Sequence, residues 1–347
     1  MRRTAERAAT GFGAFWRLVA TLACCALLGS ALAAVGEPAE DLLADIADYN
    51  PSLSQDGSYR AAQDFTFRLE LRGGLVYRLS GEGVLSDENV VFLADLIAAG
   101  TGYGDTIAEP VGTFLATRSA DLAGRGEVAV GVEEYRLGLD VTGDNDRLAI
   151  SFDLTLQEFP AELFPETRHS IGPADARFVI REFSDFQCPF CANFAGQALP
   201  MIEQRLLERG DVRFEFHHFP LDSIHANAIP AALAAECVTD ANSDEDFWAF
   251  HDALFERQRA WQALNEPQPY FIQLAGEIGL STEGAAACLD EGRFQDRVQE
   301  SYDLAAGALR LTGTPSVFLN GYKIQDFLDP QAYLELIELI DAFTLDR

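Results

Sequence analysis

The chain has 347 residues, with 25 lysines and arginines against 55 aspartates and glutamates, which gives a formal net charge of −30. This acidity excludes a general nucleic-acid binder, because phosphate contacts need a basic face, and it argues against docking on anionic lipid. Apolar residues make up 48% of the chain, which is enough for a folded core, and the length suggests two domains.

Residues 1–33 have the layout of a secretory signal peptide. Arginines precede a short apolar run over residues 18–28, and a small-x-small cleavage site follows at Ala31-Leu32-Ala33. We therefore expect cleavage before Ala34 and export to the periplasm or cell envelope. The apolar run is shorter than the roughly 20 residues of a membrane span, so a retained N-terminal anchor is the disfavoured alternative.

Residues 34–160 are predicted to form a mostly antiparallel β domain (α+β) of unknown role. Phe65 to Arg72 alternates apolar and polar side chains, and Gly73-Gly74 is a candidate hairpin turn before a return strand over 75–79. Further strands are expected at 111–118, 127–140 and 147–157, with a short helix over 41–49 and another over 86–99 that Ser86 caps. We interpret Asp144 and Asp146 as part of a turn rather than a calcium loop, since no ligand set follows.

Three prolines between 159 and 173 predict a linker over 161–173, and residues 174–347 then follow a different pattern. The predicted order is β-α-β, several helices, and β-β-α. The strands are expected over 177–183, 212–219, 316–320 and 322–324, and the helices over 188–209, 225–238, 244–258, 269–279 and 281–308, with a last helix from Asp329-Pro330.

Four cysteines remain after the signal peptide, and two of them form the motif Cys188-Pro189-Phe190-Cys191. Pro189 suits the first turn of a helix, so Cys188 is placed at the helix N-terminus, where free N–H groups stabilise a thiolate. Cys191 follows one turn later and can close a disulfide with Cys188. We interpret the motif as a redox pair. The first alternative is a zinc site, but the sequence has no second pair of ligands near the motif. The other alternative is a purely structural disulfide.

Two further features belong to the predicted site. Glu182 lies on the strand before the motif, and alternation aims it inward, where a buried carboxylate can accept the proton of Cys191. An ordinary charge at the strand end is the alternative. Gly313-Thr314-Pro315 precedes a strand; if its X–Pro bond is cis, the Thr314 backbone can face the cysteines and a substrate strand, and otherwise Pro315 simply starts the strand.

These motifs make residues 174–345 resemble the DsbA-like thiol:disulfide oxidoreductase family. The matching segments are Glu182 to Cys191, Phe219-Pro-Leu with His225, Phe247-Trp248 with His251 and Leu254-Phe255, and Gly313-Thr-Pro315. The resemblance implies an α/β thioredoxin-like domain with a helical insertion at about 223–308. It implies Cys188 as nucleophile, Cys191 as resolving thiol, Glu182 as buried acid, Pro315 as cis-proline, and a substrate surface of Thr314, Pro315, Pro189 and Phe190. Phe190 replaces the histidine of the best-known strong oxidases, which leaves the oxidising power open.

Cys237 and Cys288 lie on different predicted helices of the insertion. The resemblance implies a structural disulfide between them, as in many members of the family. Two buried free thiols are the alternative. His217 and His218 end a predicted strand, so one is expected to face the core and the other to face away. His225 is expected to cap a helix. We assign no histidine a catalytic role.

The resemblance implies an exported enzyme that forms or exchanges disulfides in cysteine-containing exported proteins, with no cofactor other than the redox pair and no metal. An oxidase needs a membrane redox partner of the DsbB or VKOR kind. A disulfide isomerase or reductase is the first alternative, and homodimerisation through the N-terminal domain favours it. A non-enzymatic chaperone or binding protein that uses the N-terminal domain is the second.

Overall fold

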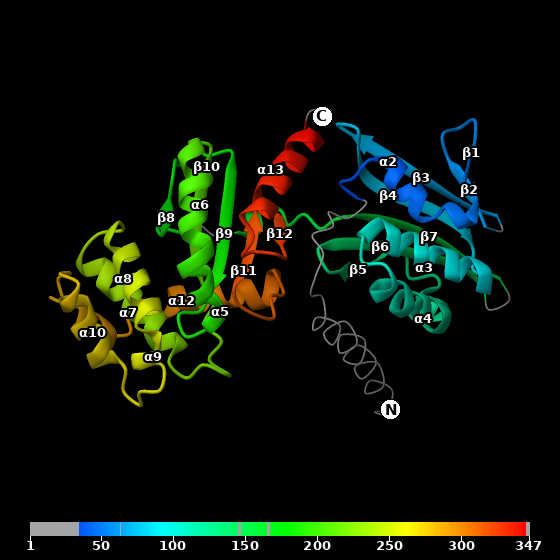
Figure 1. Ribbon diagram of the computed structural model, residues 1–347. Helices are drawn as coiled ribbons and strands as arrows, with labels where there is room; N and C mark the ends of the chain where they lie inside the picture. The colour runs from blue at the N-terminus through cyan, green and yellow to red at the C-terminus, as the bar shows by residue number, and fades with distance from the viewer. Residues whose placement is uncertain (1–34, 63, 145–146, 165–166, 345–347) are drawn as a thin grey trace, which may run out of the picture. The chain divides into compact units, whose positions relative to one another are not determined.

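The computed structural model describes residues 35–62, 64–144, 147–164 and 167–344 (Figure 1). They form two compact units, residues 1–156 with 342–347, and Gln157–Asp341. The predicted signal peptide lies outside the described residues. The predicted linker over 161–173 lies within the second unit, where it supplies a short 3-10 helix (Ala161–Leu163) and strand β8 (Ser170–Ile171).

The first unit is built on a seven-stranded antiparallel sheet with the strand order β1-β2-β3-β4-β7-β6-β5. The Gly73-Gly74 turn predicted from the sequence joins β3 to β4. Both glycines have positive φ angles, 56° and 84°, which residues with a Cβ adopt only with strain. The strands are β1 (Ser52–Leu53), β2 (Tyr59–Ala61), β3 (Phe65–Arg72), β4 (Leu75–Val84), β5 (Val128–Val132), β6 (Tyr135–Asp144) and β7 (Arg147–Leu156).

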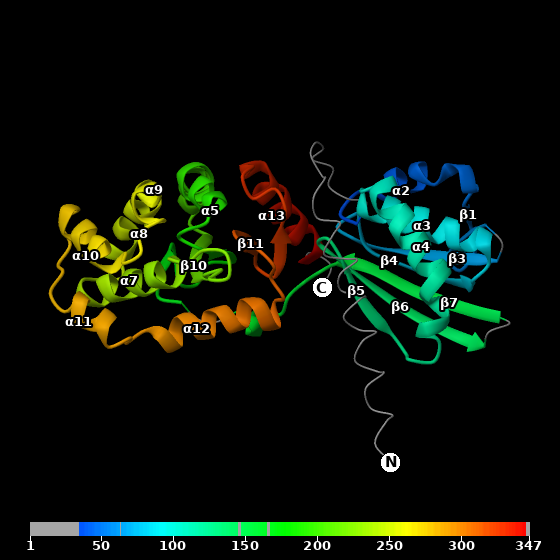
Figure 2. The same ribbon diagram turned by 90° about the horizontal axis from the view of Figure 1, so that it is seen from below.

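Helices cover one face of this sheet (Figure 2). Phe92 of one helix packs edge-on against Phe65 of β3, with ring centroids 5.4 Å apart, and both rings are fully buried. The predicted cap is present, since the Ser86 hydroxyl accepts a hydrogen bond from the N–H of Asn89 at 3.2 Å. The helices are α2 (Ala39–Asp45), a 3-10 turn (Ala47–Tyr49), α3 (Asp87–Thr101) and α4 (Asp105–Leu122).

The strand predicted over 111–118 is wrong, because this segment lies inside helix α4. The buried side chains of α4 are Ile107, Leu115, Ser119 and Leu122, which recur at helical rather than alternate spacing. Pro110 sits within this helix. A short apolar run does not by itself distinguish the two structures. The single strand predicted over 127–140 is also wrong, since β5 and β6 form a hairpin there.

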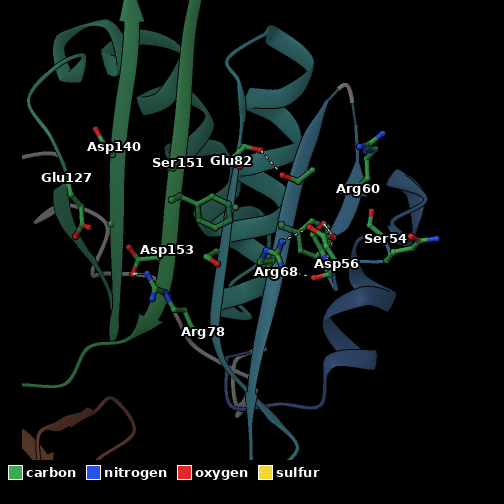
Figure 3. A pocket seen from close by; sticks show the side chains of 18 residues that line it. Ser54, Asp56, Arg60, Arg68, Arg78, Glu82, Glu127, Asp140, Ser151 and Asp153 are labelled. Carbon is green, nitrogen blue, oxygen red and sulfur yellow. Dashed lines mark hydrogen bonds and ion pairs between the residues drawn. The ribbon is translucent and has the colours of Figure 1, made fainter.

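The other face of the sheet is polar and holds an open cavity of about 710 Å³ (Figure 3). Arg68 pairs with Asp56 at 2.6 Å, and Arg136 pairs with Asp153 at 3.1 Å. Antiparallel sheets commonly leave one face in water, and exposed ion pairs contribute only about 0–1 kcal/mol each. We therefore interpret this surface as the solvated face of a half-buried sheet.

The second unit has a five-stranded mixed sheet with the order β12-β11-β9-β10-β8. Strand β9 (Phe178–Ser184) is central and runs parallel to β10 (Val212–His218) but antiparallel to β11 (Ser316–Leu319). The predicted Asn320-Gly321 turn leads from β11 to β12 (Tyr322–Ile324). This arrangement confirms the predicted thioredoxin-like α/β fold of the second unit.

The predicted helix over 188–209 is made of consecutive shorter segments. They are α5 (Pro189–Asn193), a π-helical turn (Phe194–Ala198), α6 (Leu199–Arg205) and a 3-10 turn (Leu207–Arg209). The helical insertion follows β10, and its last predicted helix is also divided. The later helices are α7 (Ala228–Ala241), α8 (Asp246–Glu256), α9 (Gln258–Trp261), α10 (Gln268–Glu277), α11 (Ala285–Asp290), α12 (Gln295–Asp303), a π-helical turn (Leu304–Ala308) and α13 (Pro330–Thr344).

A disulfide joins Cys237 of α7 to Cys288 of α11, with the two Cα atoms 5.8 Å apart. Both cysteines are buried within the apolar core of the helical insertion, beside Phe247 and Phe271. The bridge therefore ties the ends of the insertion's core together. No helix in the described part of the chain is long and apolar enough to cross a membrane.

Replacing both bridge cysteines, Cys237→Ser with Cys288→Ser, is expected to lower the free energy of unfolding. The two residues are 51 positions apart in sequence, and closing a loop of that length restricts the unfolded chain by up to about 4 kcal/mol. Denaturant unfolding of the second unit measures the loss. An unchanged midpoint and slope would contradict a stabilising role, and thiol exchange by Cys188 serves as the control for correct folding.

Candidate active site

The central strand β9 delivers the C-x-x-C motif to the start of a helix. Cys188 is the N-cap residue of α5, with extended backbone angles, and Pro189 follows in the first turn as predicted. The N–H of Ala192 donates to the Cys188 carbonyl at 3.1 Å, which closes the first turn. The Cys188 side chain thus lies where the first N–H groups of the helix have no partner within it. Both cysteines are free thiols.

The Thr314–Pro315 peptide bond is cis, and it lies against the motif. The Cys188 thiol is 3.4 Å from the carbonyl oxygen of Thr314. These two segments are 126 positions apart in the chain, and the pairing of β9 with β11 brings them together. The structure therefore brings Thr314 and Pro315 to the cysteine that begins the motif.

The two thiols of the motif have opposite electrostatic surroundings. A hydrogen bond from the Cys191 thiol lowers the pKa of Cys188 to about 6, with further help from Thr314 and from the N–H groups of Cys191 and Phe190, against the effect of burial. Burial raises the pKa of Cys191 well above its usual value, and its side chain is fully enclosed. Cys188 is therefore the thiolate at neutral pH and Cys191 the protonated partner.

Glu182 lies beneath the motif on β9 and is completely buried. Neither carboxyl oxygen has a hydrogen-bond partner among the described residues. Burial raises the pKa of Glu182 to about 8, and the charge of Glu182 in turn raises the pKa of Cys191. A buried carboxyl group with no partner is costly to keep, so its place beside a buried thiol marks it as a candidate proton acceptor.

Several polar residues around the motif were given no role from the sequence. Asp185 is buried and accepts hydrogen bonds from the N–H of Leu221 at 2.9 Å and from His225 at 2.7 Å. Gln258 donates from its side chain to the carbonyl oxygens of Phe186 and Cys188, at 2.9 and 3.0 Å. Both side chains therefore fix the backbone around the cysteines.

Asn227 extends this polar frame into the helical insertion. Its side chain donates to the carbonyl oxygens of Trp261 and Leu264, at 3.1 and 2.9 Å, and its N–H donates to the Gln187 side chain at 2.6 Å. The sequence signal for this frame was weak. Asp185 stands three residues before Cys188, but its partners lie far along the chain.

Two histidine predictions are corrected by the structure. His217 and His218 are expected to face opposite ways, one toward the core and one away from it. They do lie on opposite faces of β10, but both are buried. The two faces of β10 are both covered, since His217 stacks on Phe183 and His218 lies against Phe247 of α8. His225 was expected to cap a helix, but Asn227 is the N-cap of α7 and His225 instead binds Asp185.

Among the described residues, the buried group His169, His218 and Glu236 brings ligand atoms of metal-binding type within 4.8 Å of one another. One oxygen of Glu236 contacts both imidazoles, at 2.7 and 3.1 Å, and the other accepts from Arg168 and Arg297. Burial alone raises the pKa of Glu236, but the hydrogen bonds from the histidines outweigh it and hold the group ionised. A cation there would compete with two arginines, so we interpret the group as a hydrogen-bonded charge network.

The surface at the motif is apolar. Phe190 is 62% exposed beside Cys188, and Pro189 is exposed as well. Ile224, which is 70% exposed, lies next to His225, and His225 binds the loop that precedes the motif. Pro189 and Phe190 therefore present an exposed apolar surface beside Cys188.

Comparisons with known proteins match the second unit. The family model described as Thioredoxin matches residues 165–341, slightly more than half of the chain. Disulfide bond formation protein D of Bacillus subtilis is 31% identical over 173 residues, which cover 48% of this chain and 74% of that protein. The Na(+)/H(+) antiporter NhaA 3 of Salinispora tropica is 32% identical over 159 residues, 46% of this chain. The chain spans only 22% of the length of that antiporter.

Two solved structures are also similar to this chain. BdbD from Bacillus subtilis is 28% identical with a TM-score of 0.43, covering 52% of this chain and 94% of its own. Wolbachia pipientis alpha-DsbA1 is 20% identical with a TM-score of 0.47, covering 55% of this chain and all of its own. On the family match and the identity to disulfide bond formation protein D, this chain belongs to the thioredoxin family, among its DsbA-like thiol:disulfide oxidoreductases.

Proposed function

We propose that the protein is an exported thiol:disulfide oxidoreductase that introduces disulfides into cysteine-containing proteins outside the cytoplasm. One observation carries the proposal. Cys188, whose pKa is lowered to about 6, lies at a helix N-terminus against a cis-proline, and a buried thiol lies one turn away. The two sulfurs carry the electrons themselves, so the exchange needs no other redox group.

The chemistry follows from the two thiols. In the oxidised protein, a substrate thiolate attacks Cys188 Sγ, forms a mixed disulfide and releases Cys191 as a thiolate, which takes up a proton. A second substrate thiolate then attacks the substrate sulfur of the mixed disulfide. The substrate disulfide forms, Cys188 leaves as a thiolate, and the protein ends reduced by two electrons. The buried Glu182 is the proposed proton donor and acceptor for Cys191.

The direction of exchange follows from which redox state is stabilised. A thiolate stabilised by hydrogen bonds favours the reduced form of the protein, and a protein with a stable reduced form is a strong oxidant. The lowered pKa of Cys188 therefore supports an oxidase over a reductase or isomerase. Phe190, in place of a histidine, removes one possible positive charge but leaves the Cys191 hydrogen bond in place.

Substrates bind over the apolar surface beside the motif in this proposal. Pro189 and Phe190 supply exposed apolar contacts, and the Thr314 backbone ahead of Pro315 supplies hydrogen bonds to an extended peptide. An oxidase must be reoxidised, and a membrane redox partner of the DsbB or VKOR kind fills that role. Homodimerisation through the first unit remains a prediction.

Changing Cys188 to Ala is expected to abolish oxidation of a reduced, cysteine-containing test protein, because the attacked sulfur is gone. The rate at which disulfides appear in that test protein measures the effect. In a buffer that contains glutathione disulfide, Cys191→Ala is expected instead to accumulate a mixed disulfide between Cys188 and glutathione, with a glutathione thiolate as the leaving group, since the buried resolving thiol is absent. Undiminished oxidation by the Cys188→Ala variant would refute the proposed function.

The reduction potential of the Cys188–Cys191 pair is expected to be oxidising, between about −180 mV, which is typical of protein disulfide isomerase, and about −120 mV, which is typical of the strong oxidase DsbA. Equilibration with glutathione redox buffers measures it. A value near about −270 mV, which is typical of thioredoxin itself, would make the protein a reductant and reverse the proposed direction.

Changing Glu182 to Gln is expected to alter the pH dependence of stability. A carboxyl group whose pKa is raised from 4.5 to about 8 on folding binds a proton that the unfolded chain has lost, so stability falls as pH rises through that range. The variant lacks this loss. The free energy of unfolding of the variant minus that of wild type should therefore increase by about 3 kcal/mol between pH 4.5 and pH 7.

Denaturant unfolding of both reduced proteins across this pH range measures the difference, in which the titration of groups that do not interact with Glu182 cancels. A constant difference between the two proteins would mean that Glu182 ionises normally in the folded state. The same variant should also resolve mixed disulfides more slowly above neutral pH, where the wild-type carboxylate is ionised.

A further inference from the structure

Asp185 is the residue whose backbone contacts both cysteines of the motif. Its N–H points at Cys191 Sγ, with the nitrogen 3.5 Å from the sulfur. Its carbonyl oxygen accepts a hydrogen bond from the N–H of Cys188 at 3.0 Å. The position of the Asp185 backbone therefore determines whether an N–H group donates to the buried sulfur of Cys191.

The Asp185 side chain is a fully buried anchor for this backbone. One carboxyl oxygen accepts from the N–H of Gln187 at 2.7 Å. The other accepts from the N–H of Leu221 at 2.9 Å and from Nδ1 of His225 at 2.7 Å. Three donors thus hold one carboxylate. Two of them, Leu221 and His225, lie in the loop after β10, 36 and 40 residues beyond Asp185 in the sequence.

Cys191 needs such an anchor because nearly everything else opposes its ionisation. Burial, the thiol of Cys188 and the charge of Glu182 all raise the pKa of Cys191. The backbone N–H of Asp185 acts in the opposite direction. A hydrogen bond to a sulfur anion is favourable only while the donor is held in line with it.

We propose that Asp185, held by His225, is a positioning residue for the resolving thiol: it aims its own N–H at Cys191 Sγ during resolution. This inference rests on the proposed thiol exchange. Resolution is the reverse of the first step of that exchange: the Cys191 thiolate attacks Cys188 Sγ, the Cys188–Cys191 disulfide forms, and the bond from Cys188 to its partner sulfur breaks. The partner leaves as a thiolate, and the proton of Cys191 passes to Glu182 and then to water.

The variants follow from the hydrogen-bond geometry. Asp185→Asn keeps the size of the side chain, but in either orientation its NH₂ group faces an N–H donor, so the anchor fails. His225→Leu removes the imidazole donor. His225→Asn keeps an N–H close to the place of Nδ1 and is the conservative rescue.

An aromatic disulfide reagent that releases a coloured thiolate separates the two chemical steps. Mixed with reduced protein, it releases one thiolate when Cys188 attacks it and a second when Cys191 resolves the mixed disulfide. No protein substrate is needed, so the test is independent of whether exported proteins are the substrates. Asp185→Asn and His225→Leu should slow the second release roughly tenfold or more, as a misplaced reacting group does. The first release should change by less than about threefold, and His225→Asn should restore the second.

Glu215→Gln is the matched control for loss of a buried ion pair. Glu215 is buried on β10 and binds Arg181 and Arg213 at 2.9 and 2.8 Å. This variant should lower stability without selectively slowing the second release. The inference is overturned if Asp185→Asn releases the second thiolate at the wild-type rate, or if the Asp185, His225 and Glu215 variants slow both releases in proportion to their loss of stability.

Discussion

The burial of Cys191 beside Glu182 is the constraint on which the rest of the second unit depends. Both groups are enclosed, and burial raises the pKa of each. The charge of Glu182 raises the pKa of Cys191 further, so both groups stay neutral at physiological pH. Cys188 lies one turn away at the helix start and has the opposite preference. In the proposed mechanism, this difference, rather than the spacing of the cysteines alone, makes one sulfur the attacking group and the other the resolving group.

The fold maintains that difference by contacts that are distant in sequence. The parallel pairing of β9 with β10 brings the loop after β10 to Asp185, and the pairing with β11 brings Thr314 to Cys188. The helical insertion adds Gln258, which holds the Cys188 carbonyl from α9. The Cys237–Cys288 bridge closes the insertion's own core. The insertion is thus part of the site's framework as well as a cover for it.

The sequence predicted those parts of the site whose signals are local. The C-x-x-C spacing, the proline after Cys188, and the inward place of Glu182 all follow from neighbours in the chain. The Asp185–His225 pair did not, because its members are 40 residues apart and the matching segments that contain them do not show that the two side chains meet. The burial of both His217 and His218 was missed for a related reason, since a strand reveals which residues alternate but not whether both faces are covered. In the first unit, the error over 111–118 came from a short apolar run that fits a helix and a strand equally.

The large negative net charge of the chain has only a small effect on the ionisation of Cys188. A net charge of −30 opposes any thiolate, but each carboxylate some 10 Å away in water contributes only about 0.4 kcal/mol before salt screens it. The arginines of the second unit also neutralise buried acids locally, as Arg181 does for Glu215. By contrast, the pKa of Cys188 falls from 9.0 to about 6, and each unit is worth about 1.4 kcal/mol. Each distant carboxylate therefore has far less effect on the pKa of Cys188 than the donors in direct contact with its sulfur, which keep that thiol ionised at neutral pH.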